Sequence, residues 1–253
     1  MPRSRKILIV LGSTVAALAL AAFGAWWFVL RSDAPAPVSL DDAVESLSTT
    51  TTGAANDTTT TTVPSDDLSG TWVVDTGSFA GYRVQEELAN VGFTTAAGRS
   101  DQVTGSLSIT DGTVTAVDAV TAVDTVTVVE VSVDMTALAS DSDRRDRAIE
   151  TQALETRDFP TATFVLSEAI TLPDGADAGT AFTIPATGDL TIHGVTNRVT
   201  IDLEARFVDD RIVVVGSTPV LFADYDIDQP EAIVVLSVGD DGTMEFQLIF
   251  TRG

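Results

Sequence analysis

Apolar and polar residues alternate along the chain from Ser69 to the C-terminus. The clearest run places apolar residues at every second position: Val199, Ile201, Leu203, Ala205 and Phe207. Polar residues fill the positions between them, and a second run repeats the pattern with Met244, Phe246, Leu248 and Phe250. Because successive side chains of a strand point to opposite faces, this alternation predicts β-strands with one buried and one solvated face.

Turn-forming pairs separate the alternating runs. They are Asp111-Gly112, Asp174-Gly175, Asp209-Asp210 and Asp241-Gly242, and the last of these predicts a hairpin before Met244. The segments between such turns number roughly eight to ten. About 185 residues of antiparallel strands indicate an all-β barrel or sandwich, and alternation alone does not separate the two.

One short helix interrupts the strands. Ser140-Asp141-Ser142-Asp143 places short acceptors and acidic groups where they stabilise the first turn of a helix. The helix is predicted to run from Arg144 to about Glu155 and to end before Phe159-Pro160.

The N-terminus predicts a membrane anchor. The apolar run Ile7 to Leu30 has 24 residues, and as a helix it would span about 36 Å, enough to cross a bilayer. It is longer than the apolar part of a cleaved signal peptide, so we interpret residues 1–31 as an uncleaved anchor, with cleavage near Ala34-Pro35-Ala36 as the alternative. Basic residues precede the run, so the positive-inside rule predicts a single-pass protein of the cytoplasmic membrane with everything after Arg31 outside the cytoplasm.

Residues 32–68 differ in composition from the later part of the chain. They are rich in Thr, Ser, Pro and Asp and contain few large apolar side chains. Such a segment buries too little surface to offset the entropy of ordering, so it is predicted to be a disordered linker. The remaining chain, 69–253, is predicted to form one domain.

Charge and residue inventory exclude several functions. All 37 acidic residues follow Arg31, against ten arginines and no lysine, so repulsion excludes nucleic acid as a partner. The chain has no cysteine and one histidine, which excludes thiolate catalysis and zinc sites built on cysteine or on two histidines. No nucleophile elbow or phosphate-binding loop is present, so the chain is predicted not to be an enzyme and to carry no cofactor and no metal.

A series of short segments carries a family resemblance through its order along the chain. The segments are Trp72–Asp75, Ser78–Val84, Gly98-Arg99, Val103–Gly105, Val133–Leu138, Ser140-Asp141, Arg145-Asp146, Phe159–Phe164, Gly188–Thr196, Phe222–Ile227 and Glu245-Phe246. In this order they resemble the YceI-like, lipid-binding family in its exported, actinobacterial form. The resemblance covers Ser69 to Gly253. It implies an antiparallel lipocalin-like β-barrel whose apolar interior accepts an isoprenoid chain, such as a polyprenyl phosphate or an isoprenoid quinone.

The resemblance and the aromatic content together suggest ligand-binding residues. They are Phe79, Tyr82, Phe164, Phe182, Phe207, Phe222, Phe246, Phe250, His193 and Arg145, and Phe93 is a further candidate for the barrel interior. Each Phe is about as well explained by a solid core as by a ligand pocket. His193 is more simply a structural residue before a turn, and Arg145 more simply pairs with the neighbouring acids of its own helix.

Two functions therefore remain open. In the first, the barrel is hollow and binds an isoprenoid-type lipid for storage or transfer. In the second, the barrel is solid and serves as a structural or protein-binding ectodomain. The presence or absence of an internal cavity separates the two.

Overall fold

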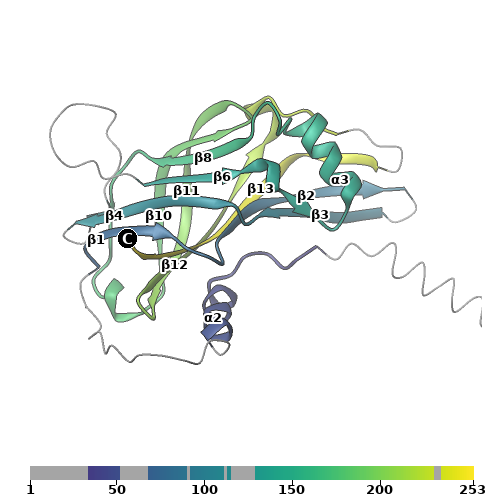
Figure 1. Cartoon of the computed structure of the whole chain (residues 1–253). Helices are drawn as coiled ribbons and strands as arrows, with labels where there is room; N and C mark the ends of the chain where they lie inside the picture. The colour runs from purple at the N-terminus through teal and green to yellow at the C-terminus, as the bar shows by residue number, and fades with distance from the viewer. Residues whose placement is uncertain (1–33, 52–67, 90–91, 111–112, 115–128, 231–234) are drawn as a thin grey trace, which may run out of the picture. The chain divides into compact units, whose positions relative to one another are not determined.

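The computed structural model describes residues 34–51, 68–89, 92–110, 113–114, 129–230 and 235–253 (Figure 1). The strands are β1 (Gly70–Val74), β2 (Phe79–Leu88), β3 (Gly92–Ser100), β4 (Val103–Thr110), β5 (Thr113–Val114), β6 (Glu130–Asp134), β7 (Ala139–Ser140), β8 (Thr161–Leu166), β9 (Ile170–Thr171), β10 (Phe182–Ile192), β11 (Val195–Val208), β12 (Arg211–Leu221) and β13 (Val235–Arg252). The helices are α2 (Leu40–Thr51) and α3 (Asp143–Ala148), with a π-helical turn η2 (Ile149–Ala153) and 3-10 turns η1 (Met135–Ala137), η3 (Ala176–Ala178) and η4 (Phe222–Tyr225).

Eight antiparallel strands close into a barrel. Around the barrel the order is β1, β13, β12, β11, β10, β8, β6 and β4. Strand β1 closes the circle because it pairs with β4 on one side and with β13 on the other. Closure removes the free sheet edges that a sandwich would keep. The structure thus decides for the barrel, which the alternation had left open.

Strand β13 is shared between the barrel and an extension at one end. Its last residues pair with β1, whereas its first part, from Val235 to Gln247, pairs with β2. Strands β2 and β3 pair along their whole length and form a hairpin that lengthens this side of the barrel. The end that they surround is also covered by α3, which follows directly after the short strand β7 on β3.

Two predicted turns have different outcomes. Asp209 and Asp210 both have positive φ and form the tight turn between β11 and β12, as predicted. The hairpin predicted at Asp241-Gly242 is wrong, because both residues lie within β13. There the register between β13 and β2 shifts between Val238 and Gly242, so the Asp-Gly pair marks a bulge in a continuous strand.

The predicted helix after Ser140 is confirmed. Ser142 caps its N-terminus, with the side-chain oxygen accepting from the backbone N–H of Arg145, and α3 continues directly into the π-helical turn η2. The buried side chains of this segment are Ile149 and Ala153, which turn toward the end of the barrel.

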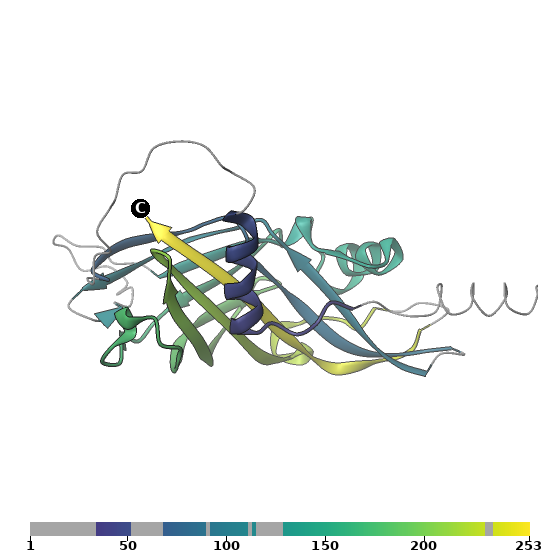
Figure 2. The same cartoon turned by 90° about the horizontal axis from the view of Figure 1, so that it is seen from below.

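The interpretation of residues 32–68 as a disordered linker is wrong for its first part, because α2 forms there and packs on the barrel (Figure 2). Leu40, Ala43 and Leu47 lie on one face of α2 and are buried against the outward side chains of β12 and β13. Those side chains are also apolar: Val213, Val215 and Ile249. The physical reason is amphipathic spacing, since even a polar segment orders when its few apolar residues share one helix face and find an apolar partner.

The residues before α2 are held by a buried ion-pair cluster, here called the latch, formed by Arg83, Arg99 and Glu245. The carboxylate of Glu245 is 2.7 Å from Arg83 Nε and 2.8 Å from Arg99 Nη2, and Glu245 is 1% exposed. Both arginines also donate to the backbone before α2, Arg83 to the carbonyl of Pro35 and Arg99 to that of Ala36. The latch therefore fixes residues 35–38 across β2, β3 and β13.

Within the residues described, no helix is both long and apolar enough to cross a membrane. The predicted anchor over residues 1–31 lies outside the described residues, and so does the second part of the predicted linker.

Candidate functional site

The barrel interior holds an apolar cavity of about 150 Å³, here called cavity 1. All the long strands of the barrel contribute to its wall. Aromatic rings make up much of the lining: Phe164, Phe182, Phe207, Phe246 and Phe250. Its one charged lining residue, Arg206, donates to the backbone carbonyl of Gly179. Cavity 1 therefore offers an almost entirely apolar ligand contact surface, with Arg206 as its one charged residue.

A second cavity of the same volume, here called cavity 2, lies at the end of the barrel that the β2–β3 hairpin extends. Its wall combines residues of β2, β3 and β13 with η1, α3, η2 and η4. Four residues line both cavities: Ala80, Val133, Ala162 and Met244. The two cavities therefore adjoin at the level of these four residues, here called the waist.

Two glycines make room for the rings that shape these cavities. Gly98 lies directly opposite Tyr82, and Gly216 directly opposite Phe246. A Cβ atom at Gly98 would lie 2.6 Å from the Tyr82 ring, and one at Gly216 would lie 2.5 Å from the Phe246 ring. These distances are shorter than two non-bonded carbon atoms allow. Any side chain at Gly98 or Gly216 would therefore displace the ring opposite it.

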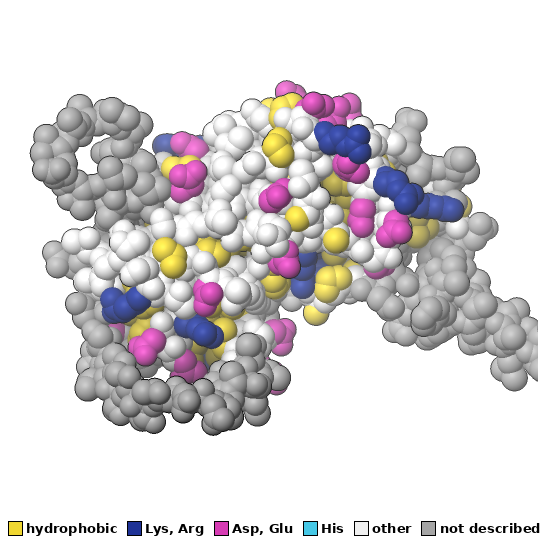
Figure 3. Space-filling model, viewed as in Figure 1, with side chains coloured by type: hydrophobic (Ala, Val, Ile, Leu, Met, Phe, Trp, Pro, Cys, Tyr) yellow, Lys and Arg dark blue, Asp and Glu magenta, His cyan; other side chains and the backbone are white. Residues whose placement is uncertain are grey.

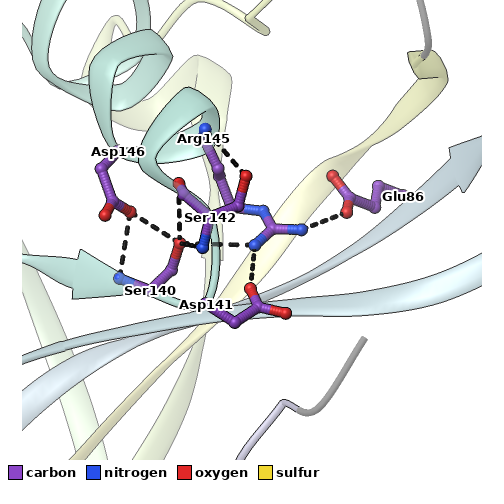
Figure 4. A network of polar contacts seen from close by, with 6 residues as sticks. All are labelled: Glu86, Ser140, Asp141, Ser142, Arg145 and Asp146. Atoms are coloured by element: carbon purple, nitrogen blue, oxygen red, sulfur yellow. Dashed lines mark hydrogen bonds and ion pairs between the residues drawn. The ribbon is translucent and has the colours of Figure 1, made fainter. Parts of the chain in front are cut away.

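A polar network lies at the wall of cavity 2 (Figure 4). At its centre, Arg145 of α3 donates from Nη2 to Glu86 of β2 at 2.6 Å and from Nη1 to Asp141. Asp146 accepts from the backbone N–H and hydroxyl of Ser140, at 3.0 and 2.6 Å, and so ties α3 to the short strand β7. The Nε of Arg145 is buried and has no hydrogen-bond partner in the described part of the chain.

The protonation states of Arg145 and Tyr82 in this wall follow from their burial and their charged neighbours. Burial lowers the pKa of Arg145, but the hydrogen bonds and charges of Glu86 and Asp141 outweigh it and raise the pKa overall, so the guanidinium stays charged. Burial raises the pKa of the Tyr82 phenol well above its ordinary value, with Arg145 opposing the shift. Tyr82 is therefore neutral at physiological pH.

Eight of the ten predicted ligand-binding residues line one of the two cavities. The five phenylalanines already named line cavity 1, and cavity 2 is lined by Tyr82, Phe222 and Arg145. The structure thus brings together residues from separate strands, a helix and a turn. Whether they contact a ligand stays a prediction, since their place in a wall does not by itself show binding.

Phe79 lies elsewhere because of strand parity. Tyr82, Val84 and Glu86 of β2 line cavity 2 and lie two positions apart, so Phe79, three positions before Tyr82, belongs to the opposite face of the same strand. There its ring lies 4.3 Å below the guanidinium carbon of Arg99, on the side of the latch. Phe93 likewise is not an interior residue, because it is 79% exposed on β3.

His193 also lies outside both cavities. It occupies the tight turn between β10 and β11 with a positive φ of 51°. Its Nδ1 lies 3.2 Å from the carbonyl oxygen of Tyr225, its Nε2 lies 3.1 Å from Glu155, and its ring contacts Phe159 edge-on. These contacts connect the turn to η4 and to the segment after η2, which is a structural role.

Sequence reasoning missed Glu86 and the residues of the waist. Glu86 is a buried acid on the inward face of β2, and the signal that identifies it is its parity with Tyr82. The waist residues are small or flexible and come from four strands, and nothing local in the sequence distinguishes them. Among the described residues, no group of three or more acidic, His or Cys side chains could hold a metal ion.

The fold and these cavities define a closed, eight-stranded antiparallel barrel with an apolar interior and one polar cavity wall. The family model for the YceI-like domain matches residues 82–250, and the chain belongs to this family. The UPF0312 protein VPA0850 of Vibrio parahaemolyticus is 27% identical over 175 residues, which are 65% of this chain and 82% of that protein.

Two solved structures share the fold. A polyisoprenoid-binding domain of Saccharophagus degradans, implicated in plant cell wall breakdown, superposes with a TM-score of 0.52 at 17% identity, covering 73% of this chain and 99% of that one. BcnA of Burkholderia cenocepacia superposes with a TM-score of 0.51 at 16% identity, covering 70% of this chain and 98% of that one. At these identities the likeness shows the fold alone.

Proposed function

We propose that the barrel binds an isoprenoid-type lipid, with the chain lying through cavity 1 and the waist and the head group in cavity 2. The observation that carries the proposal is the pair of apolar cavities that adjoin at the waist. A slender apolar chain fits such a space, because every wall residue of cavity 1 except Thr163 and the paired Arg206 is apolar. The fold shared with a polyisoprenoid-binding domain supports the same ligand class.

The alternative of a solid, ligand-free core has less support. A packed interior leaves few voids larger than a water molecule, whereas each cavity here has about 150 Å³. A dry cavity of this size costs stability unless something fills it. We propose a binding function without catalysis, since among the described residues that line the cavities no hydroxyl is hydrogen-bonded to a carboxylate or to a histidine.

The proposal extends to location. Residues 1–31 would anchor the chain in the cytoplasmic membrane, with the barrel outside the cytoplasm, where it would store or pass on the lipid. The support is the apolar run Ile7 to Leu30 and the basic residues before it. Protease added to intact spheroplasts should remove the barrel, and protection of the barrel would refute this part.

The binding proposal is tested at the waist. The full chain is purified in detergent, extracted with organic solvent, and its lipids are identified and quantified by mass spectrometry. Ala162→Trp should reduce the bound long-chain lipid several-fold, because Ala162 is buried at the waist and a large ring there blocks the passage. Thr161→Trp is the matched control, since Thr161 is the exposed neighbour on β8 and lines neither cavity.

The control should keep the lipid content of the wild type. If the wild-type chain carries no more lipid than detergent-matched protein without a barrel, or if both variants lose lipid equally, binding inside the barrel is wrong.

A further inference from the structure

The two cavities differ in their charged residues, and this difference orients an amphiphilic ligand. Cavity 1 has one charged lining residue, Arg206, whose Nε donates a hydrogen bond to the backbone carbonyl of Gly179. Cavity 2 is lined by Glu86, Arg145 and Asp228. The polar end of a ligand therefore belongs in cavity 2, and the kind of head group follows from how these charges are balanced.

The positive charge at cavity 2 is fully used within the protein. Arg145 is paired with both Glu86 and Asp141, so one guanidinium faces two carboxylates. Asp228 adds a second carboxylate to the wall of the cavity, besides Glu86; Asp141 does not line it. The other arginines of α3, Arg144 and Arg147, do not line the cavity.

The outer surface does not change this balance. On the face shown in Figure 3, basic side chains lie over α3 with acidic side chains close beside them. The chain as a whole carries a net charge of −23. A head group in cavity 2 thus meets a wall with more negative than positive charge, and among the described residues that line it there is no surplus cation.

One hydrogen-bond donor of Arg145, a residue of this wall, has no partner among the described residues. Arg145 Nε is buried without a partner in the described residues, while both terminal nitrogens of the same guanidinium are occupied. A buried donor without a partner is costly, and an acceptor oxygen supplied by a ligand would satisfy it. Such an oxygen needs no negative charge of its own.

We propose that cavity 2 selects an electrically neutral head group with an acceptor oxygen, such as a carbonyl or hydroxyl, and discriminates against phosphate and carboxylate heads. This inference rests on the proposed lipid-binding function. A phosphate would bring one to two negative charges close to the buried Glu86 and to the exposed Asp228, both of which line the cavity. A neutral oxygen gains the bond to Arg145 and avoids that repulsion.

The test compares three ligands with the same isoprene chain: a polyprenol, the corresponding polyprenyl monophosphate and the corresponding isoprenoid quinone. Dissociation constants are measured by native mass spectrometry of the full chain in detergent. The quinone and the alcohol should bind at least about tenfold more tightly than the phosphate.

Glu86→Gln sharpens the test because it removes one of the two carboxylates that neutralise Arg145. In this variant the affinity for the phosphate should rise by about tenfold, while the affinity for the quinone changes little. Glu87→Gln is the matched control, since it removes the same charge from the opposite face of β2, where the side chain lines neither cavity. It should leave all three affinities unchanged.

The outcomes distinguish head-group selection from lipid binding. Equal binding of the three ligands, or tightest binding of the phosphate, overturns head-group selection and leaves lipid binding in place. Binding of none of the three overturns lipid binding and head-group selection together. The comparison of the three ligands on the wild-type chain tests head-group selection even if Glu86→Gln fails to fold.

Discussion

Replacing Leu47 or Leu40 of α2 by alanine tests whether this helix belongs to the folded domain. Both side chains are buried, at 6% and 5% exposure, and both contact the outward faces of β12 and β13. Full burial of a leucine side chain contributes about 1.5–3 kcal/mol. We therefore expect each single substitution to lower the free energy of unfolding by about this amount.

The double variant has a different expected size. In a closed core, Leu→Ala lowers the free energy of unfolding by about 2–5 kcal/mol, because the surrounding residues cannot move away and a cavity remains. Helix α2 lies on the outside of the barrel and can detach. The stability lost in the double variant therefore cannot exceed the free energy with which α2 docks on the barrel. The combined variant should therefore cost less than the sum of the single ones, a departure from additivity expected of neighbours that share one contact surface.

The assay is urea denaturation of the full chain in detergent, followed by far-ultraviolet circular dichroism, with limited proteolysis as a second readout. Cleavage between residues 34 and 68 should become faster in the leucine variants. Glu45→Ala, on the exposed side of the same helix, is the control and should shift stability by no more than about 0.5 kcal/mol. Unchanged stability and unchanged cleavage in the leucine variants would refute the docking of α2.

Three further predictions concern the latch, the glycines and the tyrosines. Glu245→Ala leaves two arginines without their buried counter-ion and should cost about 3–5 kcal/mol in urea denaturation; equal stability would show that the latch contributes nothing. Gly98→Val should displace the Tyr82 ring, destabilise by about 1–3 kcal/mol and reduce lipid content, whereas unchanged lipid content would separate the ring from binding. Burial raises the pKa of both tyrosines, Tyr82 and Tyr225, so the folded chain keeps phenol protons that the unfolded chain loses near pH 10. The stability that the buried, neutral phenols contribute is therefore present below about pH 10 and is lost as the pH rises above it. Absorbance at 295 nm should therefore show no ionisation step near pH 10 before unfolding, and such a step would place a tyrosine in solvent.

Much of the barrel could be predicted because its signals are local. Alternation identified the inward residues of β11 and β13, and most of the same residues line cavity 1. The turn at Asp209-Asp210 and the helix after Ser142 also follow from short-range chemistry. Closure by β1 could not be predicted, because it depends on pairing with β4 and β13 over long sequence separations.

Two errors had readable signals that composition concealed. Leu40, Ala43, Val44 and Leu47 follow the i, i+3, i+4, i+7 spacing of an amphipathic helix, and the Ser39 hydroxyl accepts from the N–H of Asp42 at its start. The polar composition of the segment outweighed this pattern. Phe79 and Tyr82 lie three positions apart in the sequence. Because side chains alternate between the two faces of a strand, a regular strand cannot direct both inward. The pairing of Arg145 with Glu86 joins positions 59 residues apart, and nothing in the sequence near either one indicates it.

The latch has a consequence for the order of folding. Residues 35–38 and α2 are synthesised before the barrel, yet their contact surface on β12 and β13 is synthesised last, and Val38 and Glu245 are 207 residues apart. Contacts across such separations form late, because the chain between them must first lose its freedom. Helix α2 and the residues before it are therefore among the last described segments to reach their place, and their docking requires that the closing strands of the barrel are complete.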